Sequence, residues 1–302
     1  MGHRISSSHL IYAFDRTTPP VAQVDPGEDV IFETLDTSSG VIKSREDVPR
    51  YAAIRRSDRV NPATGPIWVR GAEPGDELRV AIRAIDLISP GCVRILTMMG
   101  LLHGEVKAPD AMMAEVAGDR LVLDIGLEIP VRPMVGVIAC APDGKAVSTF
   151  HAGPHGGNMD LKECRPGAIV HLPVRVPGAL LALGDVHANM GDAEVTGTGV
   201  EICAEVSVGI ELVKGAARVR PWITLPDAWV SYGHAPDLED AIRMATRDMI
   251  EILGSRIGVS REEAYMLISA CGDVGIGQHC AGEIDRTARV IMPRLSPRRA
   301  DA

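Results

Sequence analysis

Short runs of Val, Ile and other apolar residues, separated by Gly, Pro and Asp, follow one another from the N-terminus to about residue 230. Residues 29–36 (DVIFETLD) alternate apolar and polar side chains, as a half-buried strand does. Residues 65–87 contain two such runs, joined by a turn at Pro74-Gly75-Asp76 in which Pro fixes φ and Gly permits a positive φ. This density of short strands predicts a mainly β fold, with a β-sandwich or barrel-like body and a smaller α+β portion near the C-terminus.

The pattern changes after Trp222. Residues 238–252 carry apolar side chains at helical spacing, with Asp237 as the expected N-cap and Gly258 as the expected stop. Ser260 and Glu263 have the spacing of a capping box, which predicts a second helix, and residues 288–294 (ARVIMPR) predict a last strand. We therefore expect residues 1–230 to form the mainly β body that contains the polar site, and residues 231–302 to form an integrated helical or α+β portion.

Charge and composition exclude several classes of function. The formal net charge of -9 argues against a nucleic-acid or anionic membrane surface. No apolar run approaches the roughly 20 residues of a membrane helix, and the first residues lack the apolar core of a signal peptide. The six cysteines are scattered and form no CxxC pair. Such cysteines are usually reduced and structural in a cytosolic chain of this size. We expect a cytoplasmic protein.

Polar residues concentrate in two stretches, residues 151–160 (HAGPHGGNMD) and residues 184–201 (GDVHANMGDAEVTGTGVE), joined by an almost uncharged run. One interpretation makes Asp160, Asp185 and His187 ligands of a divalent metal ion, because carboxylate and imidazole groups together suit such ions. The D-x-H spacing would place the last two on one side of an extended chain.

Two other interpretations stay open from the residues alone. Glu194 or Asp192 could act as general acid or base while histidines polarise a carbonyl group. Alternatively, all these side chains could simply satisfy the backbone of loops. Gly156-Gly157-Asn158 would let the backbone approach a small ligand closely, and its amides could stabilise an oxyanion.

Four stretches of the chain resemble the acetamidase/formamidase family: residues 61–82 (NPATGPIWVRGAEPGDELRVAI), 153–160 (GPHGGNMD), 172–201 and 260–278 (SREEAYMLISACGDVGIGQ). The resemblance implies a mostly β fold with a smaller α+β portion. It also implies hydrolysis of short aliphatic amides to ammonia and the acid, and a divalent metal ion near the D-x-H segment. The matched polar positions are Asn158, Asp160, Asp185, His187, Asp192 and Glu194.

On this basis we expect a metal-assisted amidohydrolase of linear amides. Asp160, Asp185 and His187 would bind the ion, with zinc as the first choice and calcium as the alternative. Glu194 would transfer the proton, with Asp192, Asn158 and His155 as further catalytic candidates, and Gly156 and Gly157 would contact the substrate. His155, inside the matched stretch, is preferred to His151 at its edge.

The chain departs from the family pattern at three positions, Met190, Ala193 and Gly275, where the family commonly has Gln, Gly and Arg. These departures affect the expected substrate more than the expected reaction. Another small C–N compound, such as urea, a carbamate or a larger amide, is therefore an alternative substrate. A non-enzymatic β-scaffold with a structural metal is the alternative of a different class. The expected partners are a small amide and further copies of the chain in a homo-oligomer, with no nucleic acid and no membrane.

Overall fold

A computed structural model of the chain describes residues 2–54, 59–280 and 284–295. It contains helices α1 (Asp47–Ile54), α2 (Leu238–Ile257) and α3 (Arg261–Cys271). The strands are β1 (His3–Ile5), β2 (Leu10–Ile11), β3 (Ala13–Phe14), β4 (Ala22–Val24), β5 (Asp29–Thr34), β6 (Ala63–Val69), β7 (Glu77–Ile95), β8 (Asp110–Ala117), β9 (Arg120–Leu123), β10 (Glu128–Pro130), β11 (Met134–Ala139), β12 (Val147–Ser148), β13 (Ala152–Gly153), β14 (Gly156–Asn158), β15 (Ile169–Pro173), β16 (Leu181–His187), β17 (Glu201–Val213), β18 (Trp222–Thr224), β19 (Ala228–Ala235), β20 (Asp273–Ile276) and β21 (Arg286–Pro293).

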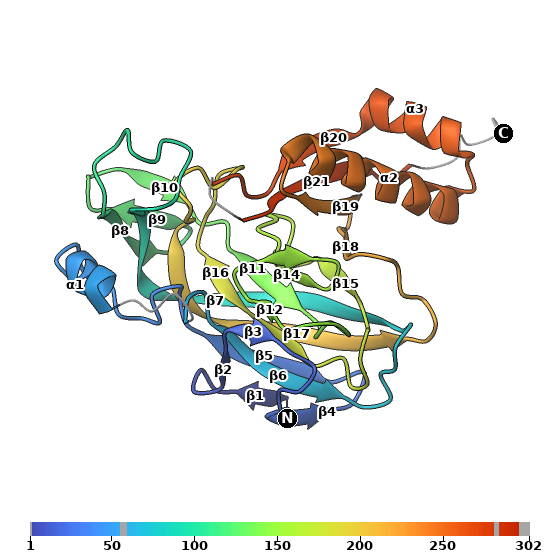
Figure 1. Cartoon of the computed structure of the whole chain (residues 1–302), viewed down its shortest axis with the longest axis horizontal. Coiled ribbons are helices and arrows are strands. Elements are labelled where there is room, and N and C mark those ends of the chain that lie inside the picture. Colours follow the sequence, from blue (N-terminus) through green and yellow to red (C-terminus); the bar gives the residue numbers. More distant parts are fainter. Residues whose placement is uncertain (1, 55–58, 281–283, 296–302) are drawn as a thin grey trace.

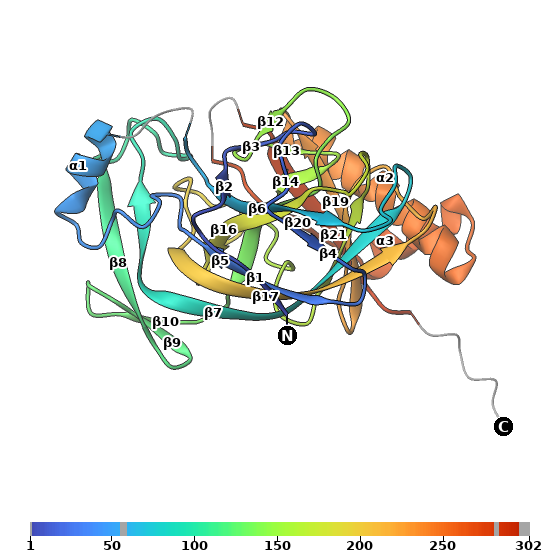
Figure 2. The ribbon, with the colours of Figure 1, turned by 90° about the horizontal axis from the view of Figure 1, so that it is seen from below.

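The long strands β7 and β17 form the antiparallel centre of the molecule and lie side by side in Figure 2. Their register runs from Glu77 opposite Val213 to Cys92 opposite Glu201. Strand β17 also pairs with β5, and β7 pairs with β15 in its first half and with β8 in its last residues. The turn predicted at Pro74–Asp76 is confirmed just before β7, and Gly75 there has a φ of 96°.

A further group of strands completes the body. Strand β16 pairs with β11 and β6, and β11 also pairs with β14. The sheet curls so that buried apolar side chains from both groups, such as Phe32, Val80, Leu183 and Val206, form one core. The predicted mainly β, barrel-like body is therefore confirmed.

Helices α2 and α3 pack against β19 and β21 at the end of the molecule opposite α1 and the β8–β10 strands (Figure 1). Asp237 caps α2, Gly258 ends it in the left-handed conformation, and Ser260 and Glu263 form the predicted capping box of α3. Gly233 of β19 allows close approach of α2, because a Cβ there would lie 2.1 Å from the Ala241 carbonyl oxygen.

Helix α1 was not predicted, because eight residues are too few to establish a helical spacing and Val48 is the one buried residue among them. The proposed division at residue 230 stays a prediction, and strand β19 runs across it. Within the described ranges, no helix combines the length and apolar character needed to cross a membrane.

Candidate active site

The candidate site lies where β16 ends and β17 begins. His187, the last residue of β16, is the cross-strand partner of Glu201, the first residue of β17. Asp185 precedes His187 in β16, Asp160 follows β14, and Glu194 lies in the loop between β16 and β17. All five side chains are buried. The fold therefore brings together acidic residues that are up to 41 positions apart in the sequence, from Asp160 to Glu201.

The imidazole of His187 is the centre of this cluster. Its Nε2 atom lies 3.4 Å from Asp185 Oδ1, 3.8 Å from Glu194 Oε1 and 3.1 Å from Glu201 Oε1. Ligand atoms of Asp160, Asp185 and His187 lie within 4.8 Å of one another, and so do those of His187, Glu194 and Glu201. The expected D-x-H arrangement is thus present, with both side chains directed at the same point.

Gly136 of β11 makes room for two of these carboxylates. A Cβ at this position would lie 2.6 Å from Asp160 Oδ1 and 2.9 Å from Asp185 Oδ2. Contacts of that length are too short for a side-chain carbon. The strand behind the cluster can therefore have no side chain at this point.

Several cluster residues have an uncommon backbone conformation. Eight non-glycine residues in the described ranges have a positive φ, among them Asn61 (58°), Asp160 (48°), Asp185 (55°) and Glu194 (47°). This region is disfavoured for residues with a Cβ and persists where the surrounding structure enforces it, commonly at functional sites. The concentration of such residues here is independent support for a functional site.

Two amide side chains organise the rim of the cluster. Asn61 Nδ2 donates to Asp185 Oδ2 at 3.1 Å and to Asn158 Oδ1 at 3.0 Å. Gln278 Nε2 donates to the carbonyl oxygen of Asn158 at 3.0 Å. The Nδ2 group of Asn158 donates to none of the described residues, so it is available to a ligand.

The electrostatics of the cluster favour a bound cation. Burial, assisted by Asp185, raises the pKa of Asp160 to about 8. Burial and Asp160 raise the pKa of Glu194 well above its usual value, and burial also raises that of Glu201. Burial opposes ionisation of Asp185 and His187 as well, but the imidazole holds the Asp185 pKa below its usual value, and Glu201 and Asp185 raise that of His187. One imidazole cannot neutralise four buried carboxylates, so they must bind protons or a cation.

Unsatisfied polar atoms point to the same conclusion. Both carboxylate oxygens of Asp160, Asp185 Oδ1 and both ring nitrogens of His187 are buried without a hydrogen-bond partner in the part of the chain that the structure describes. Buried polar atoms are almost always paired, so these atoms are available to a ligand. Asp160, Asp185 and His187 could hold a metal ion, and so could His187, Glu194 and Glu201.

The other predicted residues lie in different surroundings. Asp192 forms ion pairs with Lys162 and Arg289, both at 2.8 Å, and ion pairing lowers its pKa against the opposing effect of burial. His155 is buried with its ring edge against Phe14, and burial lowers its pKa to about 4, so it is neutral at pH 7. The catalytic roles assigned to Asp192 and His155 stay predictions.

Gly156 and Gly157 lie in β14, which pairs with β11 on one side and β13 on the other. A Cβ at Gly156 would be 2.4 Å from the Ile138 carbonyl oxygen, and one at Gly157 would be 2.2 Å from that of His151. Close approach between strands therefore accounts for both glycines. Their contact with substrate stays a prediction.

Sequence reasoning assigned no role to Glu201 or Asn61. Glu201 was visible as an acidic residue that begins a long apolar strand, but its partner His187 could be found only from the strand register. Asn61 lies 97 residues from Asn158 and 124 from Asp185, its hydrogen-bond acceptors. The available signal was the N-terminal stretch 61–82, which resembles the family and begins at this residue.

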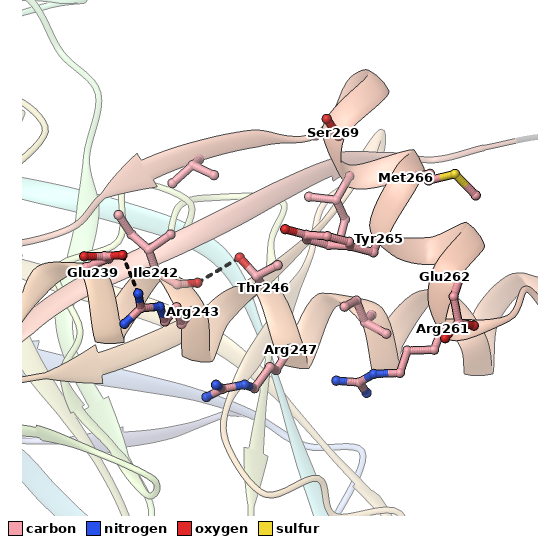
Figure 3. Close-up of a pocket in the computed structure, with 14 residues that line it drawn as sticks. Glu239, Ile242, Arg243, Thr246, Arg247, Arg261, Glu262, Tyr265, Met266 and Ser269 are labelled. Carbon is pink, nitrogen blue, oxygen red and sulfur yellow. Dashed lines mark hydrogen bonds and ion pairs between the residues drawn. The ribbon is translucent and has the colours of Figure 1, made fainter.

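A separate groove of about 940 Å³ lies between α2 and α3 and contains no member of the cluster (Figure 3). Arg243 and Arg247 line it from α2, and the exposed Tyr265 and Met266 line it from α3. Among the described residues, its walls contain no group of metal-binding type, in contrast to the His187 cluster.

Known proteins resemble this chain in both sequence and structure. The model of the Acetamidase/Formamidase family matches residues 8–152 and 144–293. The crystal structure of an acetamidase from Bacillus halodurans superimposes with a TM-score of 0.90 at 37% sequence identity, covering 96% of this chain and 97% of that one.

Sequence relatives are consistent with the structural match. An acetamidase from Mycolicibacterium smegmatis is 30% identical in an alignment that covers 83% of this chain and 82% of that protein. A further relative from Schizosaccharomyces pombe is 25% identical over 259 residues, and this alignment spans 62% of its length.

Proposed function

The chain belongs to the acetamidase/formamidase family, and we propose on this basis that it hydrolyses short aliphatic amides, of the formamide or acetamide type, to the carboxylic acid and ammonia. The observation that carries the proposal is the buried cluster of four carboxylates around His187, with the free amide group of Asn158 at its rim. Such a site combines a proton-transfer group, a place for a cation and a hydrogen-bond donor, which are the components that hydrolysis of an unactivated amide requires.

We propose that Asp160, Asp185 and His187 hold a divalent metal ion, with zinc as the first candidate and calcium as the alternative. Zinc bonds of about 2.0–2.1 Å in a tetrahedral site place neighbouring ligand atoms about 3.3 Å apart. The 3.4 Å between His187 Nε2 and Asp185 Oδ1 fits this spacing, and an imidazole ligand favours zinc over calcium. When bound, the ion supplies Lewis acidity and lowers the pKa of a bound water, to about 7 on zinc.

The residues of the chain supply the remaining chemistry. Glu194 would accept the proton of the attacking water and pass it to the departing ammonia, because a bound cation favours the ionised form of a carboxyl group whose pKa burial otherwise raises. Asn61 fixes the Asn158 amide by donating to its oxygen, so Asn158 Nδ2 can donate to the developing oxyanion. Asn61 also donates to Asp185 Oδ2. The orientation of the Asn158 amide is therefore coupled to that of the Asp185 carboxylate in the cluster.

The test is ammonia release from formamide and acetamide by the zinc-loaded protein. We expect Glu194→Gln to lower kcat by about 10²–10⁴-fold, and Asp185→Asn to lose both activity and stoichiometric metal. Glu77→Gln is the matched control, because Glu77 is another buried carboxylate paired with a histidine, His171, at 2.9 Å and outside the cluster.

Near wild-type rates in both cluster variants would remove the assigned roles. A wild-type protein that releases ammonia from urea, a carbamate or a larger amide but from neither small amide would change the substrate class. If a chelator unfolds the protein and no amide is cleaved at all, the site is a structural metal centre instead.

The cytoplasm is the compartment we propose, in line with six cysteines that are all free thiols. The homo-oligomer expected from the sequence also remains our proposal. Light scattering on the purified protein measures the oligomeric state directly.

A further inference from the structure

The carboxylate of Glu201 has a polar neighbour at each of its oxygens. Oε1 lies 3.1 Å from His187 Nε2, and Oε2 accepts a hydrogen bond of 2.9 Å from the hydroxyl group of Thr37. Thr37 belongs to neither β16 nor β17 but follows β5, so a separate segment of the chain determines how this carboxylate is turned.

Thr37 is held in turn by two residues. Arg94 Nη2 donates to the Thr37 hydroxyl oxygen, and the Tyr51 hydroxyl donates to the Thr37 carbonyl oxygen at 2.9 Å. The Arg94 guanidinium also lies over the Tyr51 ring, 5.6 Å from its centroid. Helix α1, which carries Tyr51, is thereby connected to the cluster through a short chain of side-chain contacts.

The direction of these hydrogen bonds follows from the chemistry of the groups. A guanidinium can only donate, and a hydroxyl has a single proton. Because Thr37 accepts from Arg94, its own proton is free to go to Glu201, and no other orientation satisfies both contacts. The Thr37 hydroxyl therefore donates to Oε2 of Glu201, and the other carboxylate oxygen, Oε1, faces His187.

Arg94 is well placed to serve as the fixed end of this chain. It lies in β7, two residues beyond Cys92, which is the cross-strand partner of Glu201. Its side chain is buried, and its backbone amide donates to the Thr198 hydroxyl at 2.8 Å, which ties it to the loop before Glu201. A buried cation near Glu201 also offsets part of the negative charge of the cluster.

We propose that Thr37 and Arg94 are positioning residues that hold the Glu201 carboxylate with Oε1 directed at His187. This inference deepens the proposed function and rests on it for the effect on catalysis. In this proposal both residues act through Glu201. Groups that orient the immediate surroundings of a metal typically change metal affinity or activity by about 10–100-fold when they are removed.

The experiment compares Thr37→Val, Thr37→Ser and Thr34→Val. Thr37→Val removes the hydroxyl group while keeping the shape, and Thr37→Ser keeps it. Thr34→Val is the matched control, because the Thr34 hydroxyl also bonds to β17, at the Ala204 carbonyl oxygen, but does not touch Glu201. We expect Thr37→Val to weaken zinc binding in a chelator competition, and to lower kcat, by about 10–100-fold, with little change in KM. Thr37→Ser and Thr34→Val should stay near wild type.

Crystal structures of the wild type and of Thr37→Val give a readout that is independent of activity. We expect Glu201 to leave its orientation toward His187 in the variant. A Glu201 carboxylate that stays in place, or a Thr37→Val protein that matches Thr34→Val in zinc affinity, would overturn the proposal. A wild type that cleaves no amide would instead overturn the proposed function, and the Glu201 orientation would still test the positioning role.

Discussion

Ala193 is one of the positions at which the chain departs from the family pattern, and its backbone conformation is energetically unfavourable. Its φ is 72°, in the left-handed region. For a residue with a Cβ this conformation costs about 1–2 kcal/mol, whereas glycine adopts it freely. The adjacent Glu194 has the same conformation, with a φ of 47°, and it carries the proposed proton-transfer group.

We predict that Ala193→Gly raises the free energy of unfolding by about 1 kcal/mol, because it relieves the left-handed strain. Ala217→Gly is the control, since Ala217 is also half-buried but does not have a positive φ, and it should lower stability by about 0.5–1 kcal/mol. Urea unfolding of both variants measures the difference. Equal destabilisation by the two substitutions would contradict the prediction.

The raised pKa of Asp160 leads to a prediction of how the stability of the metal-free protein depends on pH. Its pKa is raised from 3.8 to about 8, so the folded state binds this proton more tightly than the unfolded state. The stability that it contributes is complete below pH 4 and is lost as the pH rises through about 8. Between these pH values, this one group should lower the free energy of unfolding by about 1.4 kcal/mol per pH unit.

Urea unfolding of metal-free wild type and of Asp160→Asn at pH 5 and pH 8 tests this expectation. The wild type should lose stability between the two pH values, and the variant should lose less. Parallel behaviour of the two proteins would show that Asp160 ionises normally in the fold.

At the scale of elements, β11 forms the wall of the cluster. Its Gly136 determines how closely the carboxylates of Asp160, which follows β14, and of Asp185 in β16 can approach this strand. We predict that Gly136→Ala lowers the free energy of unfolding by about 1–3 kcal/mol through overpacking, and that it also lowers amide hydrolysis. Gly144→Ala is the control, because a Cβ at Gly144 would meet nothing within 4 Å. Thermal unfolding and ammonia release check both effects, and a Gly136→Ala protein as active as Gly144→Ala would contradict the prediction.

Strands β20 and β21 show how the departure at Gly275 is accommodated. Gly275 is the cross-strand partner of Arg289, and a Cβ there would lie 2.6 Å from the Arg289 guanidinium carbon. That guanidinium forms ion pairs with Glu163 at 2.9 Å and with Asp192 at 2.8 Å. A basic group is therefore present beside position 275, supplied by the neighbouring strand.

At the scale of the whole molecule, the C-terminal portion takes part in building the site. Gln278 donates to the Asn158 carbonyl oxygen, and its backbone forms a bridge with Ala193. The Thr287 hydroxyl of β21 donates to the carbonyl oxygen of Met159, next to Asp160. These contacts join the C-terminal portion to the β body next to the segment that carries Asp160.

The sequence by itself determined the features that depend on neighbouring residues. Alternation in residues 29–36, the turn at Gly75 and the caps at Asp237 and Ser260 are all confirmed, because strand, turn and cap preferences act over a few residues. The grouping of Asp160 with Asp185 and His187 was also predicted, helped by family resemblance and by their proximity in the chain.

Only the tertiary structure decided which distant groups meet. Glu201 reaches His187 through the register of β16 and β17, and Thr37, Asn61 and Gln278 reach the site from segments that no local pattern connects to it. The structure also placed Asp192 in ion pairs with Lys162 and Arg289. The physical reason is that strand pairing and burial are set by the packing of the whole chain, whereas sequence patterns report only what each segment favours locally.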